Sequence, residues 1–262
     1  MLALIHQRQE ILVEELCRIF NISAMTARRD LQALEEQGKI SRFHGGATVE
    51  VTDAVSSERA GISICRSWIA RYAASLVEDG DRILINGSDT ALALLDYLDG
   101  RRVTVYTNTG HAIDRHYPED IDLQLFGGTV RASHILTGDL TLRNLMDVRA
   151  DKAFLGCTGI SPAGEILCGI PSELGINETL ISHAEQYFIL ADHSKIGRSS
   201  PYASFLLEKP GCIVTDELAP LSVTERLRER GMEVVRVGEA SFGGADSEPG
   251  PRAPHRHPGG TI

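Results

Sequence analysis

Short apolar segments alternate with stretches of helical periodicity between residues 62 and 238. This alternation is typical of a sheet of parallel strands, because each helix returns the chain to the edge where the next strand begins. The strands are nearly all apolar, as expected when helices cover both faces. The expected strands are 82–85, 103–106, 123–126, 153–155, 187–190, 213–214 and 234–237. The expected helices are 62–77, 90–98, 140–148, 173–183 and 223–230. We therefore predict an α/β domain with a mostly parallel open sheet.

A different pattern precedes this domain. Residues 13–20, VEELCRIF, form a short amphipathic stretch that predicts one helix. Ser23 is a natural N-cap for a second helix, since its hydroxyl can accept from the next turn. Asn21 falls in the turn between them, and asparagine tolerates the left-handed conformation that a sharp bend needs. The core face of the second helix is predicted from Ala27, Leu31 and Leu34. Two helices joined by a tight turn indicate helix-turn-helix geometry.

Residues 39–43, followed by Gly45 and Gly46, predict a small hairpin or wing after the second helix. On spacing alone, an ordinary surface helix with solvated arginines fits equally well. The identities of the residues favour the helix-turn-helix. Residues 26–47, TARRDLQALEEQGKISRFHGGA, strongly resemble the signature of the DeoR family of bacterial transcription regulators, T-x-R-R-D-L, E-x-x-G and R-x-H-G-G-A.

The resemblance implies a winged helix-turn-helix that binds operator DNA. Thr26 and Arg29 are three apart and share one helix face, which we expect to point into the major groove. The full set of expected DNA-binding residues is Ser23, Met25, Thr26, Arg28, Arg29, Lys39, Arg42 and His44. In the family a complete helix precedes the segment matching VEEL. Only a turn or two remain here, so we expect the natural start to lie upstream or this domain to be trimmed.

Four polar loops directly follow expected strands. Ligands of open parallel sheets bind at the carboxyl ends of the strands, although each loop alone also fits a plain turn. The loops are Asn86-Gly87-Ser88-Asp89-Thr90, Thr107-Asn108-Thr109-Gly110, Gly127-Gly128 with Arg131, and Asp192-His193-Ser194-Lys195. Together with F-L-G at 154–156 they resemble the family's effector domain, D-x-G-T-T, T-N, G-G-x-x-R, F-L-G and D-x-S-K.

The resemblance covers about residues 1–238 and implies a fold similar to ribose-5-phosphate isomerase and the CoA-transferase group. It also implies a phosphorylated sugar or related catabolic intermediate as the effector. The expected effector-binding residues are Asn86, Gly87, Ser88, Asp89, Thr90, Thr107, Asn108, Gly127, Gly128, Arg131 and Lys195. Serine and threonine hydroxyls, main-chain N–H groups and the Lys195 ammonium could together neutralise a phosphate. No cofactor or metal is predicted.

Two positions depart from the family pattern. Asn86 stands where the family often has aspartate, and Ser88-Asp89 replaces its Gly-Thr pair. If Asp89 faces the ligand, it repels a phosphate or instead binds a sugar hydroxyl. If it faces outward or caps a helix that begins at Thr90, the anion site survives. We expect the capping role, because anions at helix N-termini are stabilising.

An enzyme of the isomerase type is the alternative function. Enolisation needs a carboxylate base and a group that polarises the carbonyl. Asp89, Asp192 and Glu173 are candidate bases, with Lys195 as the cation. Likeness of fold does not carry activity, and the attached DNA-reading segment favours a sensor. We predict a regulator, most simply a repressor of a sugar operon, and no enzymatic activity.

The charge distribution limits how DNA can be bound. The chain carries a net charge of −10, which argues against non-specific coating of nucleic acid. Residues 24–48 hold four Lys/Arg against three acids, so 4 − 3 = +1. Phosphate contact must therefore come from a few placed cations, and two or more copies would raise affinity. A homodimer or homotetramer matching symmetric half-sites is expected.

The predicted organisation is a DNA-binding domain at 1–50, a linker at 51–61, an effector-sensing domain at 62–238 and a disordered tail at 239–262. The tail is rich in glycine and proline, and its His255 and His257 fit solvated residues better than metal ligands. The five cysteines are scattered without any C-x-x-C, so spacing predicts neither a zinc site nor disulfides. No signal peptide or spanning apolar run is present, which predicts a cytoplasmic protein with no membrane partner.

Overall fold

The computed structural model describes residues 1–2, 4–5, 10–36, 39–43, 45–49, 53–115, 117–130, 134–198, 204–205 and 211–242. The chain divides into two compact units, Met1–Ser63 and Ile64–Ile262. Helix α4 (Asp53–Ser75) continues without a break across that division. None of the helices in the described part combines the length and apolarity needed to span a bilayer.

The first unit is a winged helix-turn-helix. Its elements in chain order are β1 (Glu10–Leu12), α2 (Val13–Phe20), α3 (Ala24–Glu36), β2 (Ile40–Phe43) and β3 (Gly46–Val49). The three strands form an antiparallel sheet in the order β1-β3-β2. The predicted helices and wing are confirmed, whereas strand β1 was not predicted.

The turn between α2 and α3 has the predicted geometry. Asn21 takes the left-handed conformation with φ 50° and ψ 46°. The Ser23 hydroxyl accepts a hydrogen bond from the Thr26 N–H at 3.1 Å, so it satisfies one of the donors that a helix start leaves free. On the inward face, Ala27 and Leu31 are fully buried. The cap and the core face therefore arise as the residue types predict.

Two glycines shape the tip of the wing. Gly45 has a φ of +92°, which other residues adopt only with strain. A Cβ at Gly46 would overlap the Phe43 ring and the Ile11 carbonyl oxygen. The wing strands can pack this closely onto β1 because position 46 has no side chain.

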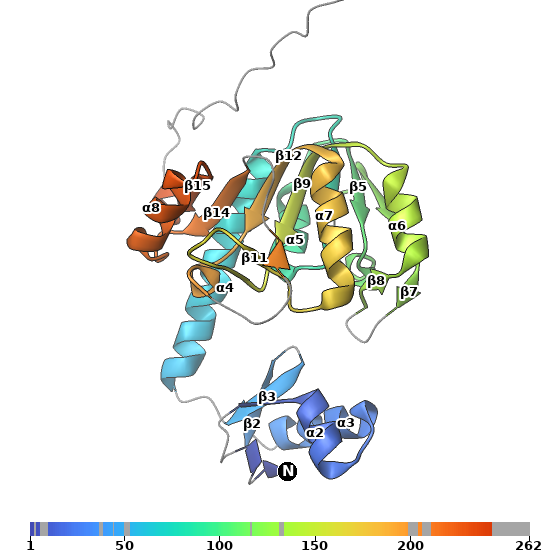
Figure 1. Ribbon diagram of the computed structural model, residues 1–262, viewed down its shortest axis with the longest axis vertical. Helices are drawn as coiled ribbons and strands as arrows, with labels where there is room; N and C mark the ends of the chain where they lie inside the picture. The colour runs from blue at the N-terminus through green and yellow to red at the C-terminus, as the bar shows by residue number, and fades with distance from the viewer. Residues whose placement is uncertain are drawn as a thin grey trace, which may run out of the picture. The chain divides into compact units, whose positions relative to one another are not determined.

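The second unit is built on a seven-stranded sheet in the order β15-β14-β12-β9-β4-β5-β6 (Figure 1). Every neighbouring pair in it is parallel. In chain order the strands are β4 (Arg82–Ile85), β5 (Val103–Thr107), β6 (Ile121–Leu125), β9 (Ala150–Gly156), β12 (Ala184–Leu190), β14 (Cys212–Asp216) and β15 (Glu233–Val237). The parallel open sheet is thus confirmed.

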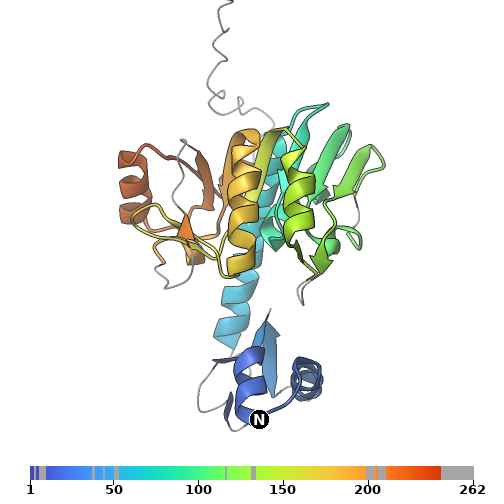
Figure 2. The same ribbon diagram turned by 45° about the vertical axis from the view of Figure 1, so that its right-hand side comes forward.

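Helices cover both faces of this sheet (Figure 2). One core joins the strands to α6 (Asp139–Met146), α7 (Leu174–Ser182) and α8 (Leu221–Glu229). The other joins them to α4, α5 (Asp89–Leu92) and the 3-10 helix η1 (Ala93–Tyr97). Leu84 packs into the first core and its neighbours Ile83 and Ile85 into the second. This double burial explains why β4 is apolar at successive positions.

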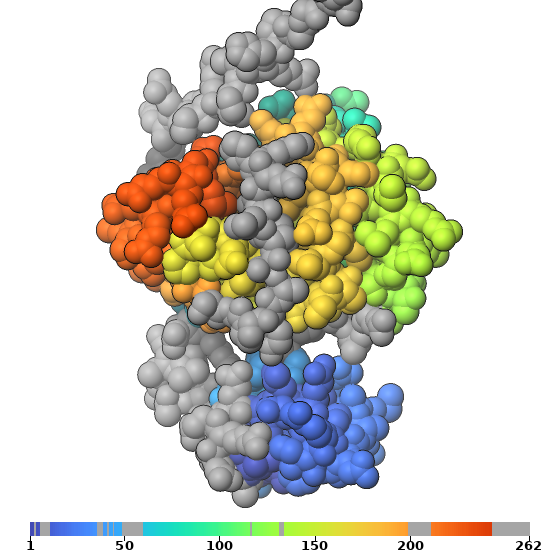
Figure 3. All heavy atoms as spheres, viewed as in Figure 1, coloured from blue at the N-terminus to red at the C-terminus, as the bar shows by residue number. Residues whose placement is uncertain are grey.

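The outer layer over the first face is continuous where α6 and α7 meet. The two helices contact each other, and their side chains lie side by side in the space-filling view (Figure 3). Behind them, Leu145 of α6 and Leu180 of α7 are fully buried. Ligands therefore have to approach the sheet from the ends of its strands and not through this layer.

The structure differs from the sequence-based boundaries in several places. Helix α4 begins at Asp53, so most of the predicted linker 51–61 is helical; its small polar residues gave no apolar stripe to detect. The predicted helix 90–98 is α5 followed by η1. The folded part runs on to η5 (Glu239–Ser241) and to Phe242, whose ring lies 4.5 Å from the Arg71 guanidinium carbon. Residues 243–262 of the predicted tail lie outside the described residues.

Several two-residue strands were not predicted from the sequence. They are β7 (Thr129–Val130), β8 (Leu136–Thr137), β10 (Gly159–Ile160), β11 (Ile166–Leu167) and β13 (Ser204–Phe205). The first two form one antiparallel pair and the other three a small antiparallel sheet. Two residues are too few to show a period of two, so such pairings depend on tertiary contacts.

Candidate functional site

The four predicted loops follow β4, β5, β6 and β12, and all lie at the carboxyl edge of the sheet, with β9 between β12 and β4. The order β12-β9-β4-β5-β6 places the loops after those strands side by side at the carboxyl edge. From β4 the chain adds β5 and β6 on one side, then crosses to β9 and adds β12 on the other. The connections therefore diverge between β4 and β9, and ligands of open α/β sheets bind at such a switch point.

Asn86, at the end of β4, ties the two strands of the switch point together. Its Oδ1 accepts from the Gly156 N–H at 3.0 Å, and its Nδ2 donates to the Gly156 carbonyl at 3.0 Å. Nδ2 also donates to Asn177 Oδ1 of α7 at 3.2 Å. An aspartate would lack both donated bonds, which gives a physical reason for the amide at this position. The side chain is buried and fully engaged.

The cap of helix α5 is Ser88 and not Asp89. The Ser88 hydroxyl accepts from the Ala91 N–H at 3.4 Å, and the helix begins at Asp89. The prediction that Asp89 caps a helix starting at Thr90 is therefore wrong by one residue, because serine competes equally well for the cap. Asp89 is exposed in the first turn, where the helix dipole favours an anion, while Thr90 is buried.

Thr107 and Asn108 close the end of β5 and are both buried. Asn108 Nδ2 donates to the Leu136 carbonyl at 3.3 Å and so holds β8 against this loop. Its Oδ1 and the Thr107 hydroxyl are buried and have no hydrogen-bond partner among the described residues. A buried polar atom without a partner costs free energy, so these two oxygens are candidates to meet a ligand or water.

Gly127 and Gly128 are required by backbone geometry. Both have positive φ, +67° and +124°. A Cβ at Gly128 would also overlap the Thr141 hydroxyl and lie 2.8 Å from the Thr137 carbonyl oxygen. The Thr141 hydroxyl donates to the Gly127 carbonyl at 2.7 Å. The glycine pair therefore has a structural role that is independent of any ligand.

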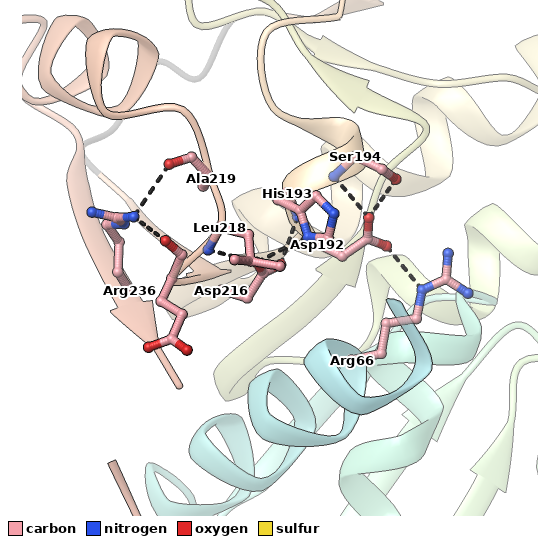
Figure 4. A network of polar contacts seen from close by, with 9 residues as sticks. Arg66, Asp192, His193, Ser194, Asp216, Leu218, Ala219 and Arg236 are labelled. Atoms are coloured by element: carbon pink, nitrogen blue, oxygen red, sulfur yellow. Dashed lines mark hydrogen bonds and ion pairs between the residues drawn. The ribbon is translucent and has the colours of Figure 1, made fainter. Parts of the chain in front are cut away.

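After β12, Asp192 forms an ion pair with Arg66 of α4 (Figure 4), and Lys195 acts electrostatically on both. The Arg66 Nε donates to Asp192 Oδ2 at 2.8 Å, and the Ser194 N–H donates to Asp192 Oδ1 at 3.0 Å. Burial opposes ionisation of Asp192, but the bonds from Ser194 and Arg66 and the nearby Lys195 outweigh it and lower its pKa. Arg66 was not predicted, since nothing local in the sequence marks its distant partner.

The Lys195 ammonium remains available for an external anion. Among the described residues it makes no hydrogen bond or ion pair of its own, although Asp192 acts on it electrostatically. Burial lowers the pKa of Lys195, and Asp192 partly offsets this. A partly desolvated cation beside the strand ends is suited to bind a phosphate or carboxylate.

Glu173 is the carboxyl of the predicted set whose pKa is raised. It precedes α7 and is four residues before Asn177, the partner of Asn86, and so lies on the same helical face. Its Oε1 is buried and meets no hydrogen-bond partner in the part of the chain that the structure describes, and burial raises the pKa of Glu173 to about 7. Near neutral pH this carboxyl can either hold or release a proton.

The start of α3 presents an exposed mixed surface in the first unit. Met25 is 81% exposed, and Arg28 and Arg29 are exposed beside it. Thr26 is half-buried, and its hydroxyl lies 2.9 Å from the Ser23 hydroxyl. The surface that the sequence predicted to face outward therefore does so, with the Thr26 hydroxyl already engaged in the cap.

The wing cations are less free than expected. The Arg42 guanidinium forms an ion pair with Glu35 of α3 at 3.7 Å. The main-chain N–H of Arg42 also donates to the Glu35 carboxylate, at 2.9 Å. Lys39 is exposed at the base of the wing. His44 and Arg131, both predicted as site residues, lie outside the described residues.

Both units match known families. Residues 1–52 match the DeoR-like helix-turn-helix domain, and residues 65–217 match the DeoR C terminal sensor domain. The chain belongs to the DeoR family. The predicted family is confirmed, and with it the class of DNA-binding transcription regulators.

Relatives named as transcription regulators match along most of their length. The chain is 33% identical to the HTH-type transcriptional repressor GlcR of Bacillus subtilis, covering 87% of this chain and 91% of that protein. It is 32% identical to the HTH-type transcriptional regulator IolR of the same organism, covering 78% and 84%. It is 29% identical to the glycerol-3-phosphate regulon repressor of Escherichia coli, covering 88% and 94%.

The expected likeness to ribose-5-phosphate isomerase is found as a partial similarity of fold. The enzyme from Methanocaldococcus jannaschii matches with a TM-score of 0.38 and 18% identity over 50% of this chain and 53% of that chain. Translation initiation factor eIF-2B of Pyrococcus horikoshii matches with a TM-score of 0.42 and 15% identity over 59% and 56%. Similarity at this level supports no inference about activity.

Proposed function

We propose that this regulator represses a carbohydrate operon and is released or retained on its operator by a phosphorylated metabolite. The observation that carries the sensing part is the Lys195 ammonium, which is partly buried at the strand ends and makes no ion pair of its own with a described residue. The name of the glycerol-3-phosphate regulon repressor points to a phosphorylated polyol in a relative. A sugar phosphate offers both the anion for Lys195 and hydroxyls for other polar groups.

DNA reading is assigned to the exposed start of α3. Arg28 and Arg29 can donate to guanine edges or phosphates, and the Met25 side chain can contact a thymine methyl. Thr26 contributes through its methyl group, because its hydroxyl is engaged with Ser23. Ser23 then positions the helix and does not read bases. Lys39 and His44 are assigned to phosphates, and Arg42 joins them only if it leaves Glu35.

At the carboxyl edge of the sheet, where we place the effector and which we call the effector edge, the predicted residues have two different roles. We assign direct contact to Lys195, Asn108 Oδ1 and the Thr107 hydroxyl, since no described residue forms a hydrogen bond with either of these two buried oxygens. Asn86 and Gly128 shape the loops that carry them. To the other described members of this proposed site we assign main-chain or hydroxyl groups; they are Gly87, Ser88, Asp89, Thr90 and Gly127. Arg131 lies outside the described residues and stays a sequence-based prediction.

The route from effector to DNA is assigned to helix α4. Arg66 of α4 binds Asp192, and Asp192 lies three residues before Lys195. An anion drawn to Lys195 reduces the positive charge that now acts on Asp192 and so changes the strength of the Arg66 pair. Because α4 runs on to Asp53 in the first unit, a shift of Arg66 can be transmitted along one helix. Control requires that the effector bind the two arrangements unequally.

An effector screen tests the sensing assignment. Phosphorylated sugars and their unphosphorylated counterparts are compared by thermal shift; a ligand at about 100 times its Kd adds about 2.7 kcal/mol of stability. In Lys195→Ala the effective compound should bind about 10–100-fold more weakly, as expected for a lost charge-assisted hydrogen bond. Operator binding without effector should persist. Arg226→Ala, an exposed cation of α8, is the matched control. Unchanged affinity in Lys195→Ala would contradict the assignment.

Arg29→Ala tests the DNA-reading assignment, on DNA selected from a random library by the full-length protein. A base-reading arginine is worth about 1–3 kcal/mol, so the Kd should rise about 5–150-fold. Arg18→Ala of α2 supplies an equally exposed arginine away from the start of α3. If both variants bind like the wild type, α3 does not read bases through Arg29.

Glu173 keeps an isomerase-type enzyme as the second candidate. A carboxyl with a pKa of about 7, four residues before Asn177, has the property required of a base that removes a proton beside a carbonyl. Incubation with pentose and hexose phosphates distinguishes the two functions. Binding without product supports the sensor, whereas turnover that is lost in Glu173→Gln supports the enzyme.

A further inference from the structure

Three potential metal-ligand side chains from distant parts of the sequence meet beside the Arg66–Asp192 pair. They are Cys65 of α4, His193 of the 3-10 helix η4 (His193–Lys195) and Asp216, the last residue of β14. One ligand atom from each lies within 4.8 Å of the other two. His193 Nδ1 is 2.9 Å from Asp216 Oδ1, and the contact can be followed in Figure 4.

The Asp216 carboxylate is held by two main-chain N–H groups, and these bonds do not involve the side chains of Cys65 or His193. Its Oδ2 accepts from the His193 main-chain N–H at 2.6 Å, and its Oδ1 accepts from the Leu218 N–H at 3.0 Å. The side chain is fully buried. Metal sites depend on such outer hydrogen bonds to hold a carboxylate in place before the ion arrives.

Charge balance provides an independent argument for a cation. Two other buried aspartates have permanent cationic partners: Asp192 has Arg66, and Asp81 has Lys152 at 2.6 Å. Asp216 has no lysine or arginine within ion-pair distance in the described part of the chain, and the imidazole beside it, that of His193, carries a charge only when protonated. A fully buried carboxylate is costly unless a cation compensates it. The negative charge of Asp216 in the Cys65–His193–Asp216 cluster is therefore not compensated by a permanently charged side chain of the described residues.

We propose that Cys65, His193 and Asp216 bind one zinc-type divalent ion through sulfur, nitrogen and oxygen. This donor set suits zinc and excludes magnesium and calcium, which require oxygen ligands. A 2+ ion with one thiolate, one carboxylate and a neutral imidazole is electrically balanced. The His193 side chain is 23% exposed, which gives an ion a path to solvent and leaves a fourth position open.

Binding exchanges a proton for the metal. Without metal, burial and the Asp216 carboxylate raise the pKa of Cys65 to about 11, so the thiol is protonated. On binding, the S–H bond breaks, a sulfur–metal bond forms and one proton leaves to solvent. The His193 Nδ1–H also gives way to the metal as that ring shifts its proton to Nε2. Sequence spacing gave no sign of this site because its ligands are far apart along the chain.

Cobalt(II) is the probe, because a cobalt–thiolate bond has a near-ultraviolet charge-transfer band that imidazole and carboxylate ligands do not give. The metal-free full-length protein should bind one cobalt per chain with this band, and added zinc should abolish it. Imidazole-only binding, for example by His255 and His257, produces no such band. Failure of the wild type to develop the band at stoichiometric cobalt overturns the proposal.

Variants assign the ligands. Cys65→Ser should lose the band, and His193→Gln should weaken cobalt binding by more than the roughly 10–100-fold that outer-shell changes cost. Cys212→Ser, another buried thiol, should keep it. Circular dichroism confirms that each variant is folded. A band that persists in Cys65→Ser places the metal at another cysteine and contradicts the site. Because DNA and effector are absent, the outcome is independent of the proposed function.

Discussion

The predicted DNA-reading surface and the predicted effector edge use their polar residues in opposite ways. At the start of α3, Met25, Arg28 and Arg29 project into solvent, whereas the hydroxyls of Ser23 and Thr26 are engaged with each other in the helix cap. At the sheet edge, Asn86 and Asn108 are buried and bonded to main-chain groups of neighbouring strands. One surface is prepared for an external partner, and the other is mostly occupied in holding its own loops together.

This difference shows what a motif means in each region. A motif on an exposed helix selects side chains for the molecule that they touch. A motif at the ends of buried strands selects side chains that fix the backbone, and the ligand then meets only a few of them. Substitutions at the sheet edge should therefore affect folding first, and substitutions at the start of α3 should affect binding first.

The largest loss of stability is expected for Asn86→Ala. The change leaves the Gly156 N–H, the Gly156 carbonyl and Asn177 Oδ1 without their partners, at about 1–3 kcal/mol for each buried group. Since water can enter the space in part, a loss of about 3–5 kcal/mol in the free energy of unfolding is expected. Urea unfolding followed by fluorescence of Trp68, which packs in the second unit, measures it.

Arg28→Ala is the counterpart on the exposed surface and should change stability by less than about 0.5 kcal/mol. If both variants unfold with nearly the wild-type free energy, the contrast between the two regions is wrong, because the Asn86 amide is then not needed to hold the loops together. Asn86 would then be available to an effector in the way that the family pattern suggests.

A smaller and pH-dependent contribution to the free energy of unfolding is expected from Glu173. Its pKa is about 7 in the folded protein against an ordinary value of 4.5, so the folded state holds the proton more tightly than the unfolded state. Stability from this group is present at low pH and is lost as pH rises from about 4.5 to about 7. With allowance for partial exposure, the loss is about 1–2 kcal/mol.

Glu173→Gln should remove this loss and be more stable than the wild type at pH 8 but not at pH 4, as measured by urea unfolding at both values. Glu178→Gln, an exposed glutamate of the following helix, is the matched control. If the wild type and Glu173→Gln keep a constant difference across the range, Glu173 is not held protonated by burial. The effector edge would then be more solvated than its buried oxygens suggest.

Local chemistry explains which features the sequence could predict. The Ser23 cap, the left-handed Asn21 and the apolar strands each depend on residues a few positions apart, and all three are present. The cap at Ser88 was missed because Ser88 and Asp89 are adjacent and both can cap. The Arg66–Asp192 pair and the Cys65 cluster join segments more than a hundred residues apart, so no local pattern marks them.

The smallest effect on stability is expected at Ser23, a predicted DNA-binding residue whose hydroxyl caps α3. Ser23→Ala removes the cap of α3 and should cost about 1 kcal/mol of stability in the first unit, whereas Ser23→Asn retains a capping oxygen and should cost little. Helical circular dichroism during thermal unfolding measures the difference. Because the change also frees the Thr26 hydroxyl, operator affinity should fall by less than about tenfold, which corresponds to about 1.4 kcal/mol. A larger loss of affinity with unchanged stability would make Ser23 a direct DNA contact, and the start of α3 would then contain no purely structural polar residue.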